Sequence, residues 1–246
     1  MPSPSQRAWL GPILCWVLLL APQLQSQESV APKAGPSGAS PAGSWQSTSD
    51  GEGQLQQTSQ PLEEDPAVSL ARWMTGLETL EATVTQRIYA NETLLEESRG
   101  RFAMAPPRLL WQIYEPFPQT LLLDEEQLQI YDQDLGQLTI QSLSNASGPM
   151  PADLLMRPDR LANGDYTITR RVLNDEQIYR LTPNASSSLF QALDIALIGE
   201  VITTLVIYDW QGQQTRLAFD NVSVNQPLPA TQFQLVVPEG TDVIRG

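Results

Sequence analysis

Hydrophobic and polar side chains alternate with a period of two along much of the chain after residue 80. In the segment 108–116, Leu109, Trp111 and Ile113 fall on one side, and Leu110 and Tyr114 fall on the other. This is the pattern of a β-strand, whose successive side chains point to opposite faces. Together with the turn residues between them, such patterns predict ten or so strands. They are drawn from twelve strand-like segments: 82–90, 93–105, 108–116, 119–124, 127–132, 135–143, 166–173, 176–183, 189–201, 202–210, 214–225 and 231–238.

Two helices are predicted beside the strands. The first begins at Asp65, which suits an N-cap, with Pro66 at the first helical position. Its hydrophobic residues recur at spacings of three and four and form one face: Leu70, Trp73, Met74, Leu77 and Leu80. The second is a short helix at 152–156, between the two groups of strands, and it carries an apolar cluster of Leu154, Leu155 and Met156.

The fold class that follows is α+β and mainly β. So many antiparallel strands curl toward an incomplete barrel, whose concave face must be filled, covered by helices or left hollow. From periodicity alone an ordinary core is the better interpretation of this face, and a cavity wall is the alternative. For residues 154–156, a permanently packed helix and a movable lid remain open. The candidate wall residues are Leu109, Trp111, Ile113, Leu121, Leu123, Ile130, Leu138 and Ile140.

Charge and composition exclude several classes of function. The formal net charge of -14 disfavours binding to nucleic acid or to anionic lipid surfaces. The chain has no histidine, and its one cysteine, Cys15, lies in the leader described below. Histidine-based triads, histidine-bound metals and thiol chemistry are therefore excluded, and no catalytic residue, cofactor or metal is expected. The acidic pair Glu125 and Glu126 does not suit hydrolysis, because neighbours on a strand point opposite ways.

Three segments organise the chain. Residues 1–27 contain one basic residue, Arg7, and an apolar run at 13–21 that is too short to span a bilayer, which predicts a secretory signal peptide. Residues 28–65 are rich in serine, glycine, proline and glutamine and predict a flexible tether. Residues 66–246 form the predicted folded domain, which must hold itself together without disulfides.

Four motifs, in their order and spacing, resemble a known family. They are "RFAMAPPRLLWQIYEPFPQTLLLDEEQLQIYDQDLGQLTIQSL" (101–143), "GPMPADLL" (148–155), "YRLTPNAS" (179–186) and "FQLVVPEGTDVI" (233–244). Together they resemble the periplasmic outer-membrane lipoprotein carrier family LolA, over about Pro66 to Ile244. One position departs from the family pattern: Ala105 stands where the family has an arginine that is thought to tie the lid shut.

The resemblance implies a half-barrel lidded by helices, with a hydrophobic cavity for the acyl chains of lipoproteins. It implies an exported, periplasmic, monomeric carrier that is not an enzyme. Its partners would be an inner-membrane ABC lipoprotein-releasing complex and an outer-membrane lipoprotein acceptor. A periplasmic lipid- or glycolipid-binding module of the same fold, without lipoprotein transfer, is the alternative.

Overall fold

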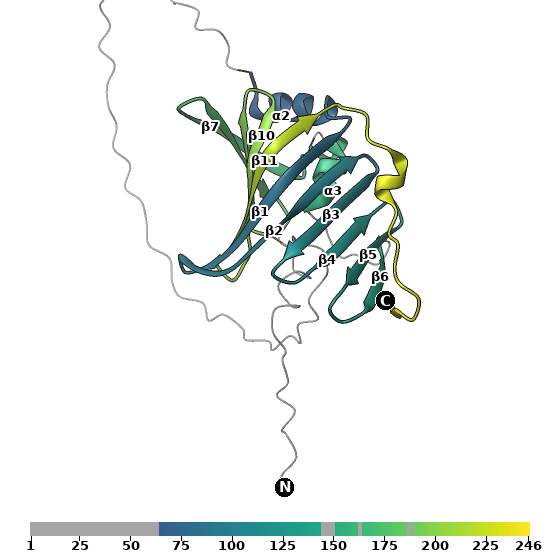
Figure 1. Cartoon of the computed structure of the whole chain (residues 1–246). Helices are drawn as coiled ribbons and strands as arrows, with labels where there is room; N and C mark the ends of the chain where they lie inside the picture. Colours follow the sequence, from purple (N-terminus) through teal and green to yellow (C-terminus); the bar gives the residue numbers. More distant parts are fainter. Residues whose placement is uncertain (1–63, 144–150, 162–163, 186–187, 189) are drawn as a thin grey trace, which may run out of the picture. The chain divides into compact units, whose positions relative to one another are not determined.

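The computed structural model describes residues 64–143, 151–161, 164–185, 188 and 190–246. The predictions for residues 1–27 and for nearly all of the tether lie outside the described residues. Within the described part, one long sheet curves around the short helix α3 (Pro151–Met156), and helix α2 (Pro66–Thr75) lies across one end (Figure 1). No helix of this part is long and apolar enough to cross a bilayer.

Helix α2 begins where the sequence predicts. The side chain of Asp65 accepts a hydrogen bond from the backbone N–H of Ala67 at 2.7 Å, and Pro66 occupies the first position. The helix ends earlier than expected, at Thr75, with Gly76 as its C-cap. Leu80 therefore belongs to the first strand instead of the helix, although it is fully buried like the apolar helix face.

The sheet has twelve strands in the order β12-β6-β5-β4-β3-β2-β1-β11-β10-β9-β8-β7. All neighbours are antiparallel except β12 and β6, which pair in parallel. The end strands β7 and β12 do not pair with each other, so the sheet is open, and the predicted fold class is confirmed. The strands are β1 (Leu80–Ala90), β2 (Thr93–Ala105), β3 (Arg108–Glu115), β4 (Gln119–Leu123), β5 (Gln127–Asp132), β6 (Gln137–Ser142), β7 (Tyr166–Leu173), β8 (Glu176–Pro183), β9 (Ala192–Ile198), β10 (Val201–Tyr208), β11 (Gln213–Val224) and β12 (Asp242–Arg245).

One glycine allows a close approach between strands in the middle of the sheet. Gly100 of β2 pairs with Val84 of β1 and with Ile113 of β3, next to a register irregularity at Arg99. A Cβ atom on Gly100 would lie 1.9 Å from the carbonyl oxygen of Gln112, so no other residue fits without moving the backbone. An irregularity of this kind, with a glycine, bends a strand and increases the local twist.

The sheet has two differently covered faces. The inner face packs against α2 and α3 and carries the larger group of buried hydrophobic residues, here named the inner cluster. The outer face carries a small group, the outer cluster, formed by Ala103, Leu110, Leu122 and Phe233. Members of the inner cluster include Leu70, Met74, Leu77, Phe102, Leu109, Trp111, Leu121, Leu123, Leu154, Leu155, Met156, Tyr179, Leu193, Ile195, Leu197, Leu205, Leu217 and Phe219.

The segment after β11 covers the outer cluster. The 3₁₀-helix η3 (Ala230–Phe233) brings Phe233 onto the outer cluster, with the guanidinium of Arg108 5.3 Å from its ring centroid. The strand predicted at 231–238 is therefore wrong. Pro229 and Pro238 flank this segment and lack the N–H groups that sheet pairing needs, so the pairing strand forms only afterwards, as β12.

Candidate functional site

The inner face of β3, β4 and β5 brings together six of the eight predicted wall residues. Leu109 pairs with Leu123, and Trp111 pairs with Leu121, which in turn pairs with Ile130. Directly opposed residues of antiparallel strands share a face, so these side chains form one apolar wall. Ile113 continues this wall on β3. Five of the six are at most 7 % exposed and belong to the inner cluster, and Ile130 is partly buried against it.

The remaining two predicted residues lie on the other face. Leu138 pairs with Tyr131, and Ile140 pairs with Gln129, which pairs with Leu122 of the outer cluster. The prediction that Leu138 and Ile140 share a wall with Leu121 is therefore wrong. The reason is the register across the β5–β6 turn, which places Thr139 opposite Ile130 on the inner face.

The predicted lid helix packs on the inner face. Leu154, Leu155 and Met156 of α3 are 0 %, 6 % and 9 % exposed and belong to the inner cluster. Leu161, at the end of the 3₁₀-helix η2 (Pro158–Leu161), joins them. These side chains thus belong to the same buried cluster as the predicted wall, and whether α3 moves remains a prediction.

The sequence-based prediction missed the part of the apolar inner face that β1, β2 and β8 to β11 form. The strands β8 to β11, β1 and β2 extend the inner face as far as the β3 wall, and two of their aromatic rings, Phe102 and Phe219, meet edge to face at 5.8 Å. The signal was present in the sequence, because large hydrophobic residues recur at every second position in β9, β10 and β11, as they do in β3. The missed residues include Val84, Phe102, Leu193, Ile195, Leu205, Ile207, Leu217 and Phe219.

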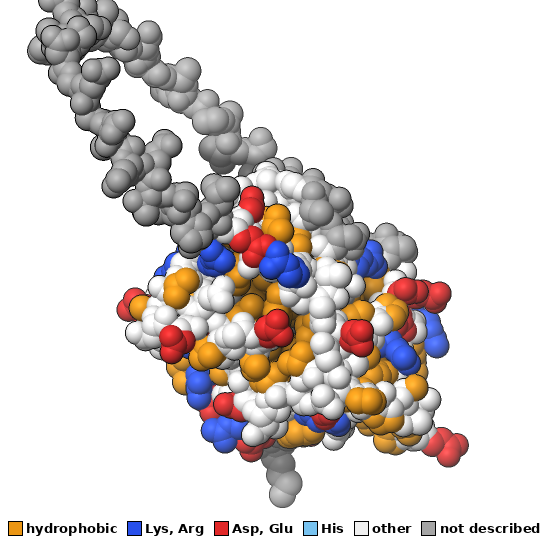
Figure 2. All heavy atoms as spheres, turned by 90° about the horizontal axis from the view of Figure 1, so that it is seen from above, with side chains coloured by type: hydrophobic (Ala, Val, Ile, Leu, Met, Phe, Trp, Pro, Cys, Tyr) orange, Lys and Arg blue, Asp and Glu red, His pale blue; other side chains and the backbone are white. Residues whose placement is uncertain are grey.

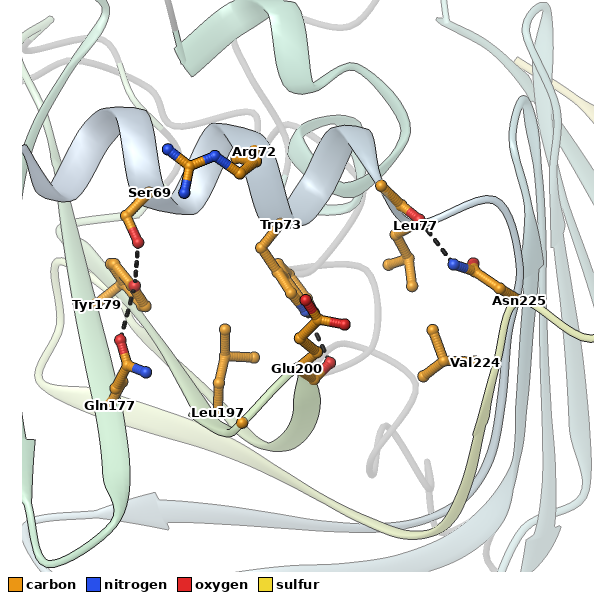
Figure 3. A pocket seen from close by; sticks show the side chains of 12 residues that line it. Ser69, Arg72, Trp73, Leu77, Gln177, Tyr179, Leu197, Glu200, Val224 and Asn225 are labelled. Carbon is orange, nitrogen blue, oxygen red and sulfur yellow. Dashed lines mark hydrogen bonds between the residues drawn. The ribbon is translucent and has the colours of Figure 1, made fainter. Parts of the chain in front are cut away.

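A cavity of about 230 Å³, here named the α2 pocket, lies between α2 and the sheet (Figure 3). On one side the hydroxyl of Ser69 lies 2.7 Å from that of Tyr179, which donates to Oε1 of Gln177 at 3.1 Å. In the middle the indole Nε1 of Trp73 donates to the carbonyl oxygen of Glu200 at 2.8 Å. These bonds join α2 to β8 and to the β9–β10 turn.

The far end of the α2 pocket is closed by Asn225. Its side chain donates to the carbonyl oxygen of Gly76 and accepts from the N–H of Glu78, both at 2.8 Å. The same carboxamide oxygen also accepts from the N–H of Thr79, at 3.3 Å. The bond to Gly76 satisfies a carbonyl group at the end of α2 that has no partner within the helix. The end of α2 is therefore attached to the sheet by one residue that lies far away in the sequence.

The surface over this end of the molecule is partly apolar. Figure 2 views the molecule from above Figure 1 and shows hydrophobic side chains gathered toward the middle of this face, with acids and arginines around them. Exposed hydrophobic residues of α2 and of the adjoining β9–β10 turn are Val68 (53 %), Ile198 (51 %) and Val201 (42 %).

A cluster of ionisable side chains with shifted pKa values lies on the outer face of the sheet, away from the apolar wall. Asp194 is almost fully buried, and its carboxylate accepts hydrogen bonds from Arg180 at 2.6 and 2.7 Å and from the hydroxyl of Tyr208 at 3.1 Å. The bond to Asp194 raises the pKa of Arg180. Burial, followed by the Asp194 charge, raises the pKa of Tyr208. Arg180 and Asp194 are paired with Val206 and not with the inner-face residues, so this cluster stabilises the sheet away from the apolar wall.

The position of Ala105 also differs from what a lid tie needs. Ala105 pairs with Arg108 and packs against the outer cluster, together with Leu228 and Leu235. The outer cluster lies on the face of the sheet opposite to the one on which α3 packs. Among the described residues, no three histidine, cysteine, aspartate or glutamate side chains are grouped so that they could hold a metal ion.

Comparisons with known proteins give a consistent result. A model of the family described as "Outer membrane lipoprotein carrier protein LolA" matches residues 75–236. The chain is 32 % identical over 152 residues to an outer-membrane lipoprotein carrier protein of Chromohalobacter salexigens, covering 61 % of this chain and 72 % of that one. It is 32 % identical over 181 residues to the protein of the same name in Hahella chejuensis, covering 72 % and 87 %.

A solved structure also matches part of the chain. The crystal structure of a LolA superfamily protein from Nitrosomonas europaea matches with a TM-score of 0.42 and 15 % identity, covering 70 % of this chain and 98 % of that one.

Proposed function

Because the chain belongs to the outer membrane lipoprotein carrier protein family LolA, we propose that it carries lipoproteins through the periplasm. It accepts them at the inner membrane from an ABC releasing complex and delivers them to an outer-membrane acceptor. Its work is binding and release, and the protein is not an enzyme. In this proposal residues 1–27 direct export, residues 28–65 are a tether and residues 66–246 are the carrier domain.

The observation that carries the proposal is the apolar wall on the inner face of an open sheet. Leu109, Trp111, Leu121 and Leu123 lie side by side there, covered by helices instead of by a second sheet. Burying one methylene is worth about 0.8 kcal/mol, so an acyl chain of about sixteen carbons needs on the order of 12 kcal/mol of apolar contact to leave a membrane. A wall of this kind supplies such contact without catalytic groups.

The closed arrangement of α3 makes release possible. Leu154 and Leu155 are buried in the same cluster as the wall residues, and in this proposal an entering acyl chain displaces them. Displacing the α3 side chains costs free energy, and this cost reduces the free energy gained by burying the acyl chain. Binding of the acyl chain is therefore weak enough to be reversible. The lid function of Leu154, Leu155 and Met156 is part of the proposal.

The experiment is a release assay. Spheroplasts supplied with ATP are incubated with the purified protein, and lipoproteins are sought in a soluble complex with it. A soluble complex that depends on the added protein is the expected result. Lipoproteins that stay in the membrane, despite a folded protein and a LolA control that releases them, would contradict the proposal. In that case, lipid that co-purifies with the protein would favour the lipid- or glycolipid-binding module.

A further inference from the structure

The α2 pocket has an apolar inner end and a polar outer end. Its lining residues Leu77, Tyr179 and Leu197 are also members of the inner cluster, so the pocket begins at the apolar wall. At the outer end lie Arg72, whose side chain is 68 % exposed, and Glu200. A molecule that passes from the wall to the surface at this place therefore meets first apolar and then polar side chains.

The size of the α2 pocket limits what it can hold. Its volume is about 230 Å³. This is less than the volume of a pocket for a drug-sized ligand, which starts at about 300 Å³. A pocket of this size suits a compact linker better than a whole acyl chain.

The polar groups of the pocket suit ester carbonyl oxygens. Gln177 uses its Oε1 to accept from Tyr179, so its amide nitrogen offers N–H donors to a ligand. The Tyr179 hydroxyl donates its one proton to Gln177, so Ser69 is the donor in the 2.7 Å bond between the two hydroxyls. The Ser69 hydroxyl can rotate away from Tyr179 and donate to a ligand carbonyl instead. Arg72 is bound to Glu64, yet a guanidinium has five N–H donors and one carboxylate does not use all of them.

Resting on the carrier function proposed above, we propose that the α2 pocket binds the neck of the lipoprotein, which is the glycerol diester that joins two acyl chains to the peptide. The acyl chains lie on the inner wall, and the peptide leaves past Arg72 and Glu200. Gln177 donates a hydrogen bond to an ester carbonyl, with Ser69 and Tyr179 beside it. A pocket for this group distinguishes a glycerol diester from a lipid without one, such as a free fatty acid.

The test compares two synthetic lipopeptides that differ only in the neck. One carries two sixteen-carbon chains on glycerol through esters, and the other carries chains of the same length through ethers, which lack the carbonyl oxygens. The full-length protein is compared with Gln177→Leu. The control is Gln129→Leu, which makes the same change on the outer face, where Gln129 pairs with Leu122 and Ile140.

The expected result is that Gln177→Leu weakens binding of the diester about tenfold and leaves binding of the diether unchanged, since one hydrogen bond to a carbonyl is lost. Gln129→Leu should change neither affinity. Tyr179→Phe, which removes the hydroxyl that orients Gln177, is the second variant if Gln177→Leu does not fold. Equal losses for both ligands, or no loss for either, would overturn the assignment of the pocket. If the unmodified protein binds neither lipopeptide, the carrier function itself is refuted.

Discussion

Replacing Leu154 by alanine should weaken the fold and at the same time tighten the binding of acyl chains. Leu154 is fully buried among the side chains of the inner cluster. If α3 leaves the wall when cargo enters, the contacts of Leu154 exist in the empty protein and are lost in the loaded one. Removing them then penalises only the empty state, so the equilibrium shifts toward the loaded state.

The magnitude follows from the burial. A buried leucine replaced by alanine costs about 2–5 kcal/mol, because the lost transfer free energy is increased by the cavity that remains. Suppose that Leu154 contributes the lower value, about 2 kcal/mol, to the empty protein and nothing to the loaded one. The apparent affinity for the acyl chain then rises on the order of 30-fold, since about 1.4 kcal/mol corresponds to a factor of ten. Any contact that Leu154 keeps with the acyl chain reduces this factor.

The assay titrates a fluorescent acylated peptide into each variant, and urea unfolding gives the free energy of unfolding of the empty protein. Leu110→Ala is the matched control, because Leu110 is also buried, at 3 % exposure, but belongs to the outer cluster. Both variants should lose similar stability, and only Leu154→Ala should bind the peptide more tightly. Equal or weaker binding by Leu154→Ala would refute the idea that α3 and the acyl chains compete for the wall.

Three further outcomes are expected. Arg180→Ala should lower the free energy of unfolding by about 3 kcal/mol in urea melts, because it leaves the buried carboxylate of Asp194 without its main partner; a loss below about 1 kcal/mol would contradict this. The hydrogen bond from Arg87 lowers the pKa of Glu97 below 4.5, so the stability that Glu97 contributes is present above that pH and is lost as the pH falls through the lowered pKa. Glu97→Gln should therefore lose less stability than the unmodified protein on acidification, and parallel pH curves would count against this. Ile140→Ser should bind acylated peptide as tightly as the unmodified protein, because Ile140 lies on the outer face.

The wall of β3 and β4 could be predicted from the sequence because its pattern is local. Period two in 108–116 already separates Leu109 and Trp111 from Leu110, and the structure keeps this division. The same rule shows that Leu138 and Ile140 share a face, but it does not say which face. The face on which Leu138 and Ile140 lie depends on the register across the β5–β6 turn, where Leu138 pairs with Tyr131. The sequence of one strand alone does not determine this register.

The α2 pocket could not be predicted in this way, because its walls come from distant parts of the chain. Ser69 and Tyr179 are 110 residues apart, and Gly76 and Asn225 are 149 residues apart. Helix α2 could be placed from its cap and its apolar face. The partners that it meets depend on how far the sheet curls, which is a property of all the strands together.

The central claim is that acyl chains lie on the inner face of the sheet, and photocrosslinking tests it most directly. A lipoprotein or lipopeptide with a diazirine in its acyl chain is bound to the unmodified protein, irradiated and mapped by mass spectrometry. Adducts should form on the inner wall, at Leu109, Trp111, Leu121 or Leu123. Adducts confined to the outer face, at Leu110, Leu122 or Phe233, would contradict the account.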